Sequence, residues 1–148
     1  MNILRYVLIT PARNEEAFLE RTILSVIGQT ILPEKWAIVS DGSTDRTDEI
    51  IQDYAARHPW IRYMRRPEHA DRQFAAKAQA FAAGHAGASS IPHDIVGNLD
   101  ADLSFEPDTM EFLLARFSAD PGLGVAGVPF VEKAIRAYDY RFTNIEHV

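Results

Sequence analysis

The sequence predicts a three-layer α/β domain, in which helices cover both faces of a mostly parallel sheet. Short runs rich in β-branched residues alternate with longer amphipathic segments, and this alternation is typical of parallel sheets. The 148 residues match the size of one domain, and a chain of this length buries enough surface to fold without disulfides. No internal repeat or linker-like stretch interrupts the chain. We therefore expect residues 1–148 to form a single domain.

Five strands are expected where short apolar runs end at turn residues. The first is a continuous apolar run that ends at Pro11, as a strand buried on both faces requires. The second ends directly before Asp41, and the third follows the His58-Pro59 pair. The expected strands are residues 6–10, 36–40, 61–64, 94–99 and 125–131.

Five helices are expected where apolar residues recur every three or four positions. Ser43 or Thr44 is a candidate cap for the second helix, and Pro107 suits the first position of the fourth. Gly84 marks the expected end of the alanine-rich third helix. The inward residues of that helix are expected to be Phe74, Ala78 and Phe81. The expected helices are residues 15–28, 43–58, 71–83, 107–117 and those from 132 onward.

The composition excludes several classes of protein. Because the chain has no cysteine, disulfide scaffolds, cysteine-ligated zinc sites, iron–sulfur clusters and thiol nucleophiles are ruled out. A net charge of −6 argues against a nucleic-acid partner. No apolar run approaches the roughly 20 residues of a membrane span, and the N-terminal residues do not form a signal peptide. We therefore expect a cytoplasmic domain without a membrane span.

Carboxylates and turn residues follow three of the expected strands. The first strand runs into Pro11-Ala-Arg-Asn-Glu15, the second into Asp41-Gly-Ser-Thr-Asp45, and the fourth into Asp100-Ala-Asp102. In open parallel sheets, ligands bind beyond the carboxyl ends of the strands. These three segments are therefore expected to meet in one site.

Asp100 and Asp102 predict a metal ion in this site. Two carboxylates at i and i+2 on an extended backbone project to the same side, and nearby like charges favour an intervening cation. Residues 94–111 contain six acids and no base, so a hard divalent ion such as Mg²⁺ or Mn²⁺ is the expected partner. The alternative is an ordinary strand-to-helix loop, in which Asp102 or Ser104 caps the helix.

Asp41 and Lys77 are further candidates. A carboxylate directly after a strand can accept hydrogen bonds from the N–H of a base or from ribose hydroxyls, although Asp-Gly-Ser-Thr is also a good turn and cap. Lys77 lies among alanines, whose small side chains allow a ligand such as a diphosphate to approach. The alternative for Lys77 is a solvated surface lysine.

Two other patterns do not predict a site. Gly122-Leu-Gly124-Val-Ala-Gly127 matches the dinucleotide fingerprint in letters, but it precedes an expected strand where the fingerprint should follow one. Asp41 and Asp45 suggest a calcium loop, but Arg46 stands where that loop needs glycine.

The three strand ends together resemble the family 2 glycosyltransferases of GT-A fold, which is Rossmann-like. The matching segments occur in the family's order and spacing, and nearly the whole chain is covered, including a segment similar to the family's first helix. They are Val7-Leu-Ile-Thr-Pro-Ala-Arg-Asn-Glu15, Arg21-Thr-Ile-Leu-Ser-Val-Ile-Gly-Gln29, Val39-Ser-Asp-Gly-Ser-Thr-Asp45 and Asn98-Leu-Asp-Ala-Asp-Leu103.

The resemblance implies a hexosyltransferase-type enzyme that binds a nucleoside-diphosphate sugar, of UDP or GDP type, with Mg²⁺ or Mn²⁺. Asp41 would contact the base, Asp100 and Asp102 would bind ribose and metal, and Asp102 is the better metal ligand. Lys77 lies where the family often has Gly-Lys-Ala-x-Ala-Leu-Asn, with alanine in place of the glycine and the asparagine. The implied binding residues are Thr10, Pro11, Ala12, Arg13, Glu15, Asp41, Lys77, Asp100, Ala101 and Asp102.

The family also implies parts that this chain does not supply. Its members usually continue into an acceptor-binding half that carries the catalytic base, so we expect the base beyond Val148 and leave the acceptor unknown. The expected reaction is an inverting sugar transfer in cell-envelope polysaccharide synthesis, and a longer parent could associate with the cytoplasmic membrane face. The alternatives are a catalytically incomplete nucleotide-sugar-binding or protein-interaction domain, and a sugar nucleotidyltransferase. The last normally has a glycine-rich loop after the first strand, which 11–15 lacks.

Overall fold

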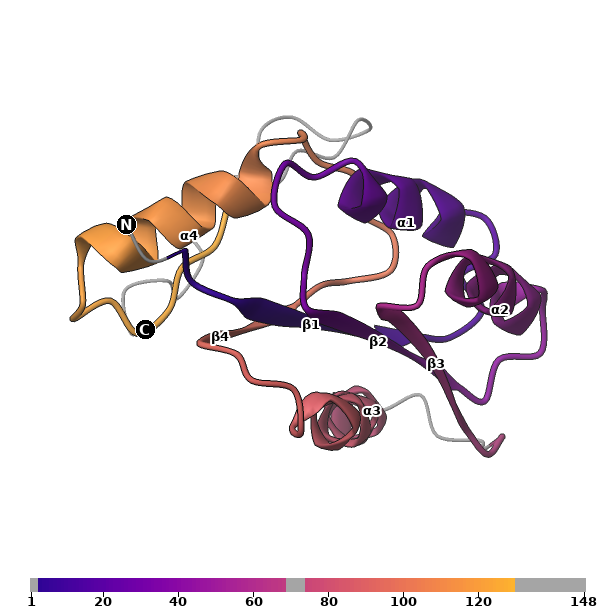
Figure 1. Ribbon diagram of the computed structural model, residues 1–148. Helices are drawn as coiled ribbons and strands as arrows, with labels where there is room; N and C mark the ends of the chain where they lie inside the picture. The colour runs from indigo at the N-terminus through magenta and orange to yellow at the C-terminus, as the bar shows by residue number, and fades with distance from the viewer. Residues whose placement is uncertain (1–2, 69–73, 130–148) are drawn as a thin grey trace.

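The computed structural model describes residues 3–68 and 74–129. Its core is a four-stranded sheet in the order β3-β2-β1-β4, and all three strand pairs are parallel. Helices α1, α2 and α4 lie on one face and α3 lies on the other (Figure 1). The predicted three-layer α/β fold is therefore confirmed. The elements are β1 (Tyr6–Ala12), α1 (Leu19–Ile27), β2 (Lys35–Asp41), α2 (Thr47–Arg57), β3 (Ile61–Arg66), α3 (Phe74–Ala88), β4 (Ile95–Asn98) and α4 (Thr109–Ala119).

The central strands β1 and β2 are buried on both faces, as their continuous apolar runs predict. Val7, Ile9 and Ala37 belong to the cluster beneath α3, whereas Leu8 and Trp36 pack on the opposite face. Full burial of each large apolar side chain contributes about 1.5–3 kcal/mol, so these strands dominate the core. The buried hydrophobic residues of α1, α2 and α4 on their face of the sheet are Leu19, Ile23, Val26, Ile51, Tyr54 and Leu114.

Helix α3 packs closely on the sheet because its inward residues are small. Its buried positions recur every four residues: Ala76, Ala80, Gly84 and Ala88. A Cβ at Gly84 would lie only 2.5 Å from the Ile9 Cγ2 atom, so only glycine fits there without movement. The helix therefore runs through Gly84, and the prediction that it ends there is wrong. The expected inward orientation is also wrong for Ala78, which is exposed, while Phe81 is half-buried and the Phe74 side chain lies outside the described residues.

The helices α1 and α2 begin later than their local sequence predicts. Residues 15–18 form a turn, in which the Leu19 amide donates to the Glu15 carbonyl, and α1 begins at Leu19. Neither Ser43 nor Thr44 caps α2, because the helix begins at Thr47, whose amide donates to Asp45 Oδ1 at 2.9 Å. The turns that precede these helices bond to each other instead, as described below.

The C-terminal part also differs from the expectation. Helix α4 begins at Thr109 after Asp108, so Pro107 is not its first residue. Residues 125–129 form no strand, and they are not part of the described four-stranded sheet, so this expectation is wrong for these residues. The remainder of that expected strand, and the helix expected from 132, lie outside the described residues. Among residues 3–68 and 74–129, none of the helices combines the length and apolar character that a membrane span needs.

Candidate nucleotide-sugar site

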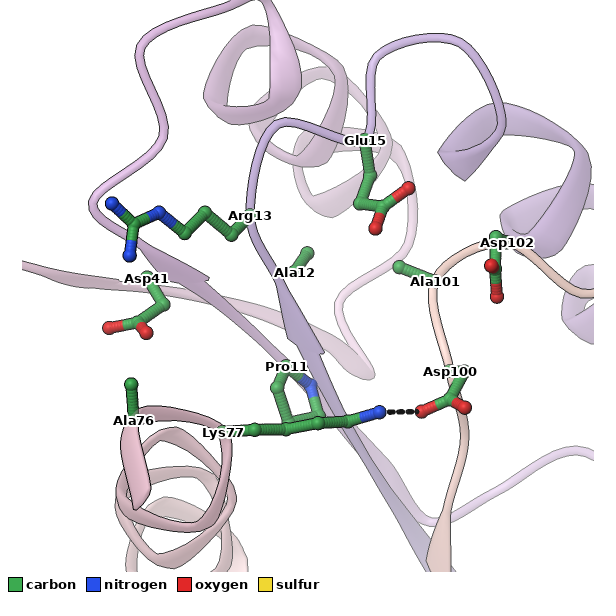
Figure 2. Close-up of a pocket in the computed structure, with 10 residues that line it drawn as sticks. All are labelled: Pro11, Ala12, Arg13, Glu15, Asp41, Ala76, Lys77, Asp100, Ala101 and Asp102. Atoms are coloured by element: carbon green, nitrogen blue, oxygen red, sulfur yellow. Dashed lines mark hydrogen bonds and ion pairs between the residues drawn. The ribbon is translucent and has the colours of Figure 1, made fainter. Parts of the chain in front are cut away.

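A pocket of about 260 Å³ opens at the carboxyl ends of β1, β2 and β4, beside α3 (Figure 2). Nine of the ten candidate residues line this pocket, together with Ala76 of α3. Thr10 is the candidate that does not, because its fully buried side chain accepts a hydrogen bond of 2.9 Å from Trp36 Nε1. The pocket residues are Pro11, Ala12, Arg13, Glu15, Asp41, Ala76, Lys77, Asp100, Ala101 and Asp102.

The turn after β1 and the turn after β2 hydrogen-bond to each other and so position the pocket residues that they carry. Asn14 has a φ of +53°, which asparagine tolerates better than most residues, and its Oδ1 accepts from the Thr44 amide at 2.8 Å. The Asn14 amide donates to Ser43 Oγ, and the Glu15 amide donates to Thr47 Oγ1. The turn after β1 and the turn after β2 therefore hold each other. Sequence reasoning identified the segments but missed these positioning roles, because the partners are about 30 residues apart.

Carboxylates converge on the side of the pocket nearest β4. Burial raises the pKa of the Glu15 carboxyl above its ordinary value. Three neighbouring carboxylates raise the pKa of Glu15 further, in falling order Asp102, Asp45 and Asp100. The charge of Lys77 lowers the same pKa. The negative potential here favours a bound cation.

Lys77 supplies a positive charge that the acidic segment itself lacks. Its Nζ donates to Asp100 Oδ1 at 2.6 Å, and both side chains are about half exposed (Figure 2). Sequence reasoning expected a divalent ion because residues 94–111 contain no base. The fold brings this lysine to Asp100 from α3, so the pair already has one counter-ion.

The donor set fits a metal that is shared with a ligand. Asp100 and Asp102 are hard oxygen donors that line the same pocket, and one or two carboxylates plus phosphate oxygens are the usual ligands of Mg²⁺. Within the described part of the chain, no group of three or more His, Asp or Glu side chains could hold an ion by itself. Asp100 and Asp102 are therefore the residues of this pocket that could hold a divalent cation together with a bound ligand.

The segment after Asp102 is anchored by side chains of α1 and of the turn after it. Thr22 Oγ1 donates to the Leu103 carbonyl at 2.7 Å, and Gln29 Nε2 donates to the Glu106 carbonyl at 2.8 Å. Gln29 Oε1 also accepts from the Met110 amide. These bonds, with Ala101 buried, fix the loop that carries the two aspartates. Neither Asp102 nor Ser104 caps α4, which begins at Thr109, so the capping role that the alternative gave to these two residues is wrong.

Asp41 pairs with a residue that sequence reasoning did not single out. The Asp41 side chain is 6 % exposed, and Arg66 Nη1 donates to its Oδ1 at 2.8 Å. The two residues are register partners at the ends of β2 and β3. Their pairing follows from the register of these two parallel strands. The sequence predicts that the strands are parallel but does not give their register.

Comparison with known proteins identifies the family of this chain. Residues 7–145 match the sequence model of the family described as glycosyl transferase family 2. The chain belongs to this family. The match favours a glycosyltransferase domain over the sugar nucleotidyltransferase alternative.

A chondroitin synthase of Pasteurella multocida (strain Pm70) is 32 % identical over 113 residues, which cover 76 % of this chain and 11 % of that protein. The family 2 domain described here therefore spans about a tenth of the length of that relative.

Two solved glycosyltransferase structures have a similar fold. One is Staphylococcus aureus TarS 1–349 in complex with UDP-GlcNAc, with a TM-score of 0.63 and 18 % identity, covering 86 % of this chain and 37 % of that one. The other is the mannosyltransferase PcManGT of Pyrobaculum calidifontis in complex with GDP-Man and Mn²⁺, with a TM-score of 0.63 and 23 % identity. It covers 84 % of this chain and 35 % of that one. These likenesses confirm the GT-A fold.

Proposed function

We propose that this family 2 domain binds a nucleoside-diphosphate sugar together with Mg²⁺ or Mn²⁺, as the donor-binding part of an inverting glycosyltransferase. The main observation behind this proposal is that one pocket is lined by Asp41, Lys77, Asp100 and Asp102. Support comes from the two similar structures, which are complexes with UDP-GlcNAc in one case and with GDP-Man and Mn²⁺ in the other. A hexosyl donor, a cell-envelope polysaccharide product and a cytoplasmic location stay predictions.

The two ends of the pocket suit the two ends of the ligand. At the β2 end, the Asp41 carboxylate would accept hydrogen bonds from a base N–H, with Arg13 and Pro11 beside it. At the β4 end, Asp100 and Asp102 would hold the cation beside the diphosphate. Asp102 is the better metal ligand of the two, since Lys77 already bonds Asp100.

The chemistry at the β4 end is charge neutralisation. A bound divalent ion supplies Lewis-acid stabilisation of the departing diphosphate. Lys77 would add a second positive charge, because the ammonium at Asp100 lies within the same pocket. Inversion also requires a base for the acceptor hydroxyl on the opposite face of the sugar, and we assign that role to none of the described residues. The proposal therefore concerns donor binding and activation.

Calorimetric titration of the chain with UDP and with GDP, each with and without Mn²⁺, tests the proposal. We expect Mn²⁺ to tighten binding of at least one of them by about tenfold or more, a coupling typical of linked sites. Asp102→Ala should remove most of this gain. Asp108→Ala, which removes an exposed carboxylate outside the pocket, is the matched control and should retain it. Failure to bind any nucleoside diphosphate, or an unchanged gain in Asp102→Ala, would contradict the proposal.

A further inference from the structure

Two arginines of β3 bond opposite ends of α3. Arg62 and Arg66 are four residues apart on the strand and therefore point to the same face of the sheet. Arg62 Nη1 donates to the Gly87 carbonyl near the end of α3, at 2.8 Å. Arg66 Nη1 donates to the Ala76 carbonyl at 3.1 Å, in the part of α3 that lines the pocket. The two contacts are alike in chemistry and differ in their distance from the pocket.

The backbone fixes Arg66 beside Asp41. The two residues face each other in the register of β2 and β3, and the Arg66 carbonyl accepts from the Gly42 amide at 3.2 Å. Gly42 has a φ of +67°, and a Cβ there would lie 2.8 Å from the Glu68 Cα atom. The chain after β3 thus crosses Gly42 too closely for any other residue. The backbone of Arg66, from which its side chain extends, is therefore held in a fixed position relative to Asp41.

The Arg66 guanidinium joins Asp41 to α3. Its Nη1 donates to Asp41 Oδ1 at 2.8 Å, and its Nη2 donates to Gln79 Oε1 at 2.8 Å. A nearly buried carboxylate requires a paired cation, and the planar guanidinium fork holds its partners in a defined geometry. Arg66 does not itself line the pocket, whereas Asp41 and Ala76 do.

We propose that Arg66 is a positioning residue that acts through Asp41 and thereby sets the base preference of the pocket. This inference rests on the proposed function, in which Asp41 meets the nucleoside base. A carboxylate held in one orientation accepts hydrogen bonds from ring N–H groups, which uracil and guanine offer on their pairing edges. Cytosine and adenine present a ring nitrogen lone pair at the corresponding place. The pocket should therefore prefer UDP and GDP to CDP and ADP, and this preference should depend on Arg66.

Titration calorimetry with UDP, GDP, CDP and ADP, each with Mn²⁺, tests the inference on the wild-type chain, Arg66→Gln and Arg62→Gln. In Arg66→Gln we expect the better of UDP and GDP to bind about tenfold more weakly or worse, because the nearly buried Asp41 carboxylate loses its ion pair with Arg66. The ratio of the affinity for UDP or GDP to the affinity for CDP or ADP should decrease at the same time. Arg62→Gln, which loses the equivalent contact at the far end of α3, should keep wild-type affinity within about twofold.

A double-mutant cycle separates action through Asp41 from a general effect on α3. If Arg66 acts through Asp41, Arg66→Gln should cause little additional loss in an Asp41→Asn background. Binding of inorganic pyrophosphate with Mn²⁺ should be nearly unchanged in Arg66→Gln. Additive losses, or equal losses for UDP and pyrophosphate, would overturn the inference. So would an equal loss in Arg62→Gln.

The outcomes also distinguish this inference from the proposed function. A wild-type chain that binds none of the four nucleotides contradicts both. A chain that binds with Mn²⁺ but keeps its affinity and base preference in Arg66→Gln contradicts the role of Arg66 alone. If Arg66→Gln does not fold, Arg66→Lys is measured in its place, because lysine keeps the positive charge but lacks the planar guanidinium group. It should narrow the base preference, and an unchanged preference would overturn the inference.

Discussion

The Lys77 ammonium lies 2.6 Å from a carboxylate oxygen of Asp100, and this ion pair joins α3 to the loop after β4 in the lining of the pocket (Figure 2). The same carboxylate is a proposed ligand of the divalent cation. In the proposed function, the lysine and the metal would therefore compete for one negative charge when the pocket holds no nucleotide. A diphosphate offers the lysine a second anionic partner, so nucleotide binding would relieve that competition.

Replacing Lys77 should change metal and nucleotide affinity in opposite directions. In Lys77→Met, Mn²⁺ alone should bind several-fold more tightly, because no ammonium competes for Asp100, while UDP or GDP with Mn²⁺ should bind about tenfold more weakly. Electron paramagnetic resonance of free Mn²⁺ measures the first effect and calorimetry the second. Lys35→Met, which removes a lysine bonded to the Pro59 carbonyl, should change neither. Equal Mn²⁺ affinity in Lys77→Met and wild type would argue against competition.

The raised pKa of Glu15 should appear in the pH dependence of stability. A carboxyl whose pKa is higher in the folded protein binds more protons when folded, so its contribution to stability falls as the pH rises above the ordinary value of 4.5. Glu15→Gln cannot ionise and escapes this loss. The free energy of unfolding of Glu15→Gln should therefore increase relative to wild type as the pH rises from 4.5 toward and through the folded pKa.

Urea denaturation of both chains across this pH range, without metal, measures that difference. Glu34→Gln removes an exposed glutamate outside the pocket and serves as the control. We expect the difference in the free energy of unfolding between Glu15→Gln and wild type to increase with pH. A difference that stays constant, or that widens as the pH falls, would show that burial and the neighbouring carboxylates do not destabilise the ionised Glu15 side chain.

The close approach of α3 to the sheet should make Gly84 intolerant of a side chain. In Gly84→Ala, the new methyl group would lie 2.5 Å from Ile9 Cγ2 and 3.0 Å from Val39 Cγ2. Overpacking of this kind costs about 1–3 kcal/mol, which exceeds or offsets the gain of about 1 kcal/mol in helix propensity. Gly87→Ala in the same helix meets the flexible Met64 side chain and should be neutral or stabilising. Thermal unfolding of both variants decides whether backbone proximity or propensity dominates.

The anchoring of the aspartate loop should make Gln29 matter for both stability and binding. Gln29→Ala leaves the Glu106 carbonyl and the Met110 amide without this partner, which should lower the free energy of unfolding by about 1–3 kcal/mol. It should also weaken Mn²⁺-dependent nucleotide binding, because the loop that carries Asp102 loses its anchor. Gln52→Ala, at an exposed position of α2, is the matched control. Weakened stability with full Mn²⁺ dependence would show that the loop is held by other contacts.

The sequence by itself determined the layers of this protein and the edge at which the site forms. The continuous apolar runs of β1 and β2 require burial on both faces, and parallel strands bring their carboxyl ends to one edge. Asp41 and the pair Asp100 and Asp102 could therefore be placed together from order and spacing alone. Periodicity and strand-end chemistry are local properties that a single sequence expresses.

Only the tertiary structure decided the contacts between distant segments. The helix starts at Leu19 and Thr47 depend on turns that bond each other, and the continuation of α3 through Gly84 depends on how closely the helix approaches Ile9. The partners of the site carboxylates, Arg66 for Asp41 and Lys77 for Asp100, come from other elements. A long side chain can reach many positions, and strand register and helix packing select one of them. That selection results from packing the whole domain and leaves no local signal in the sequence.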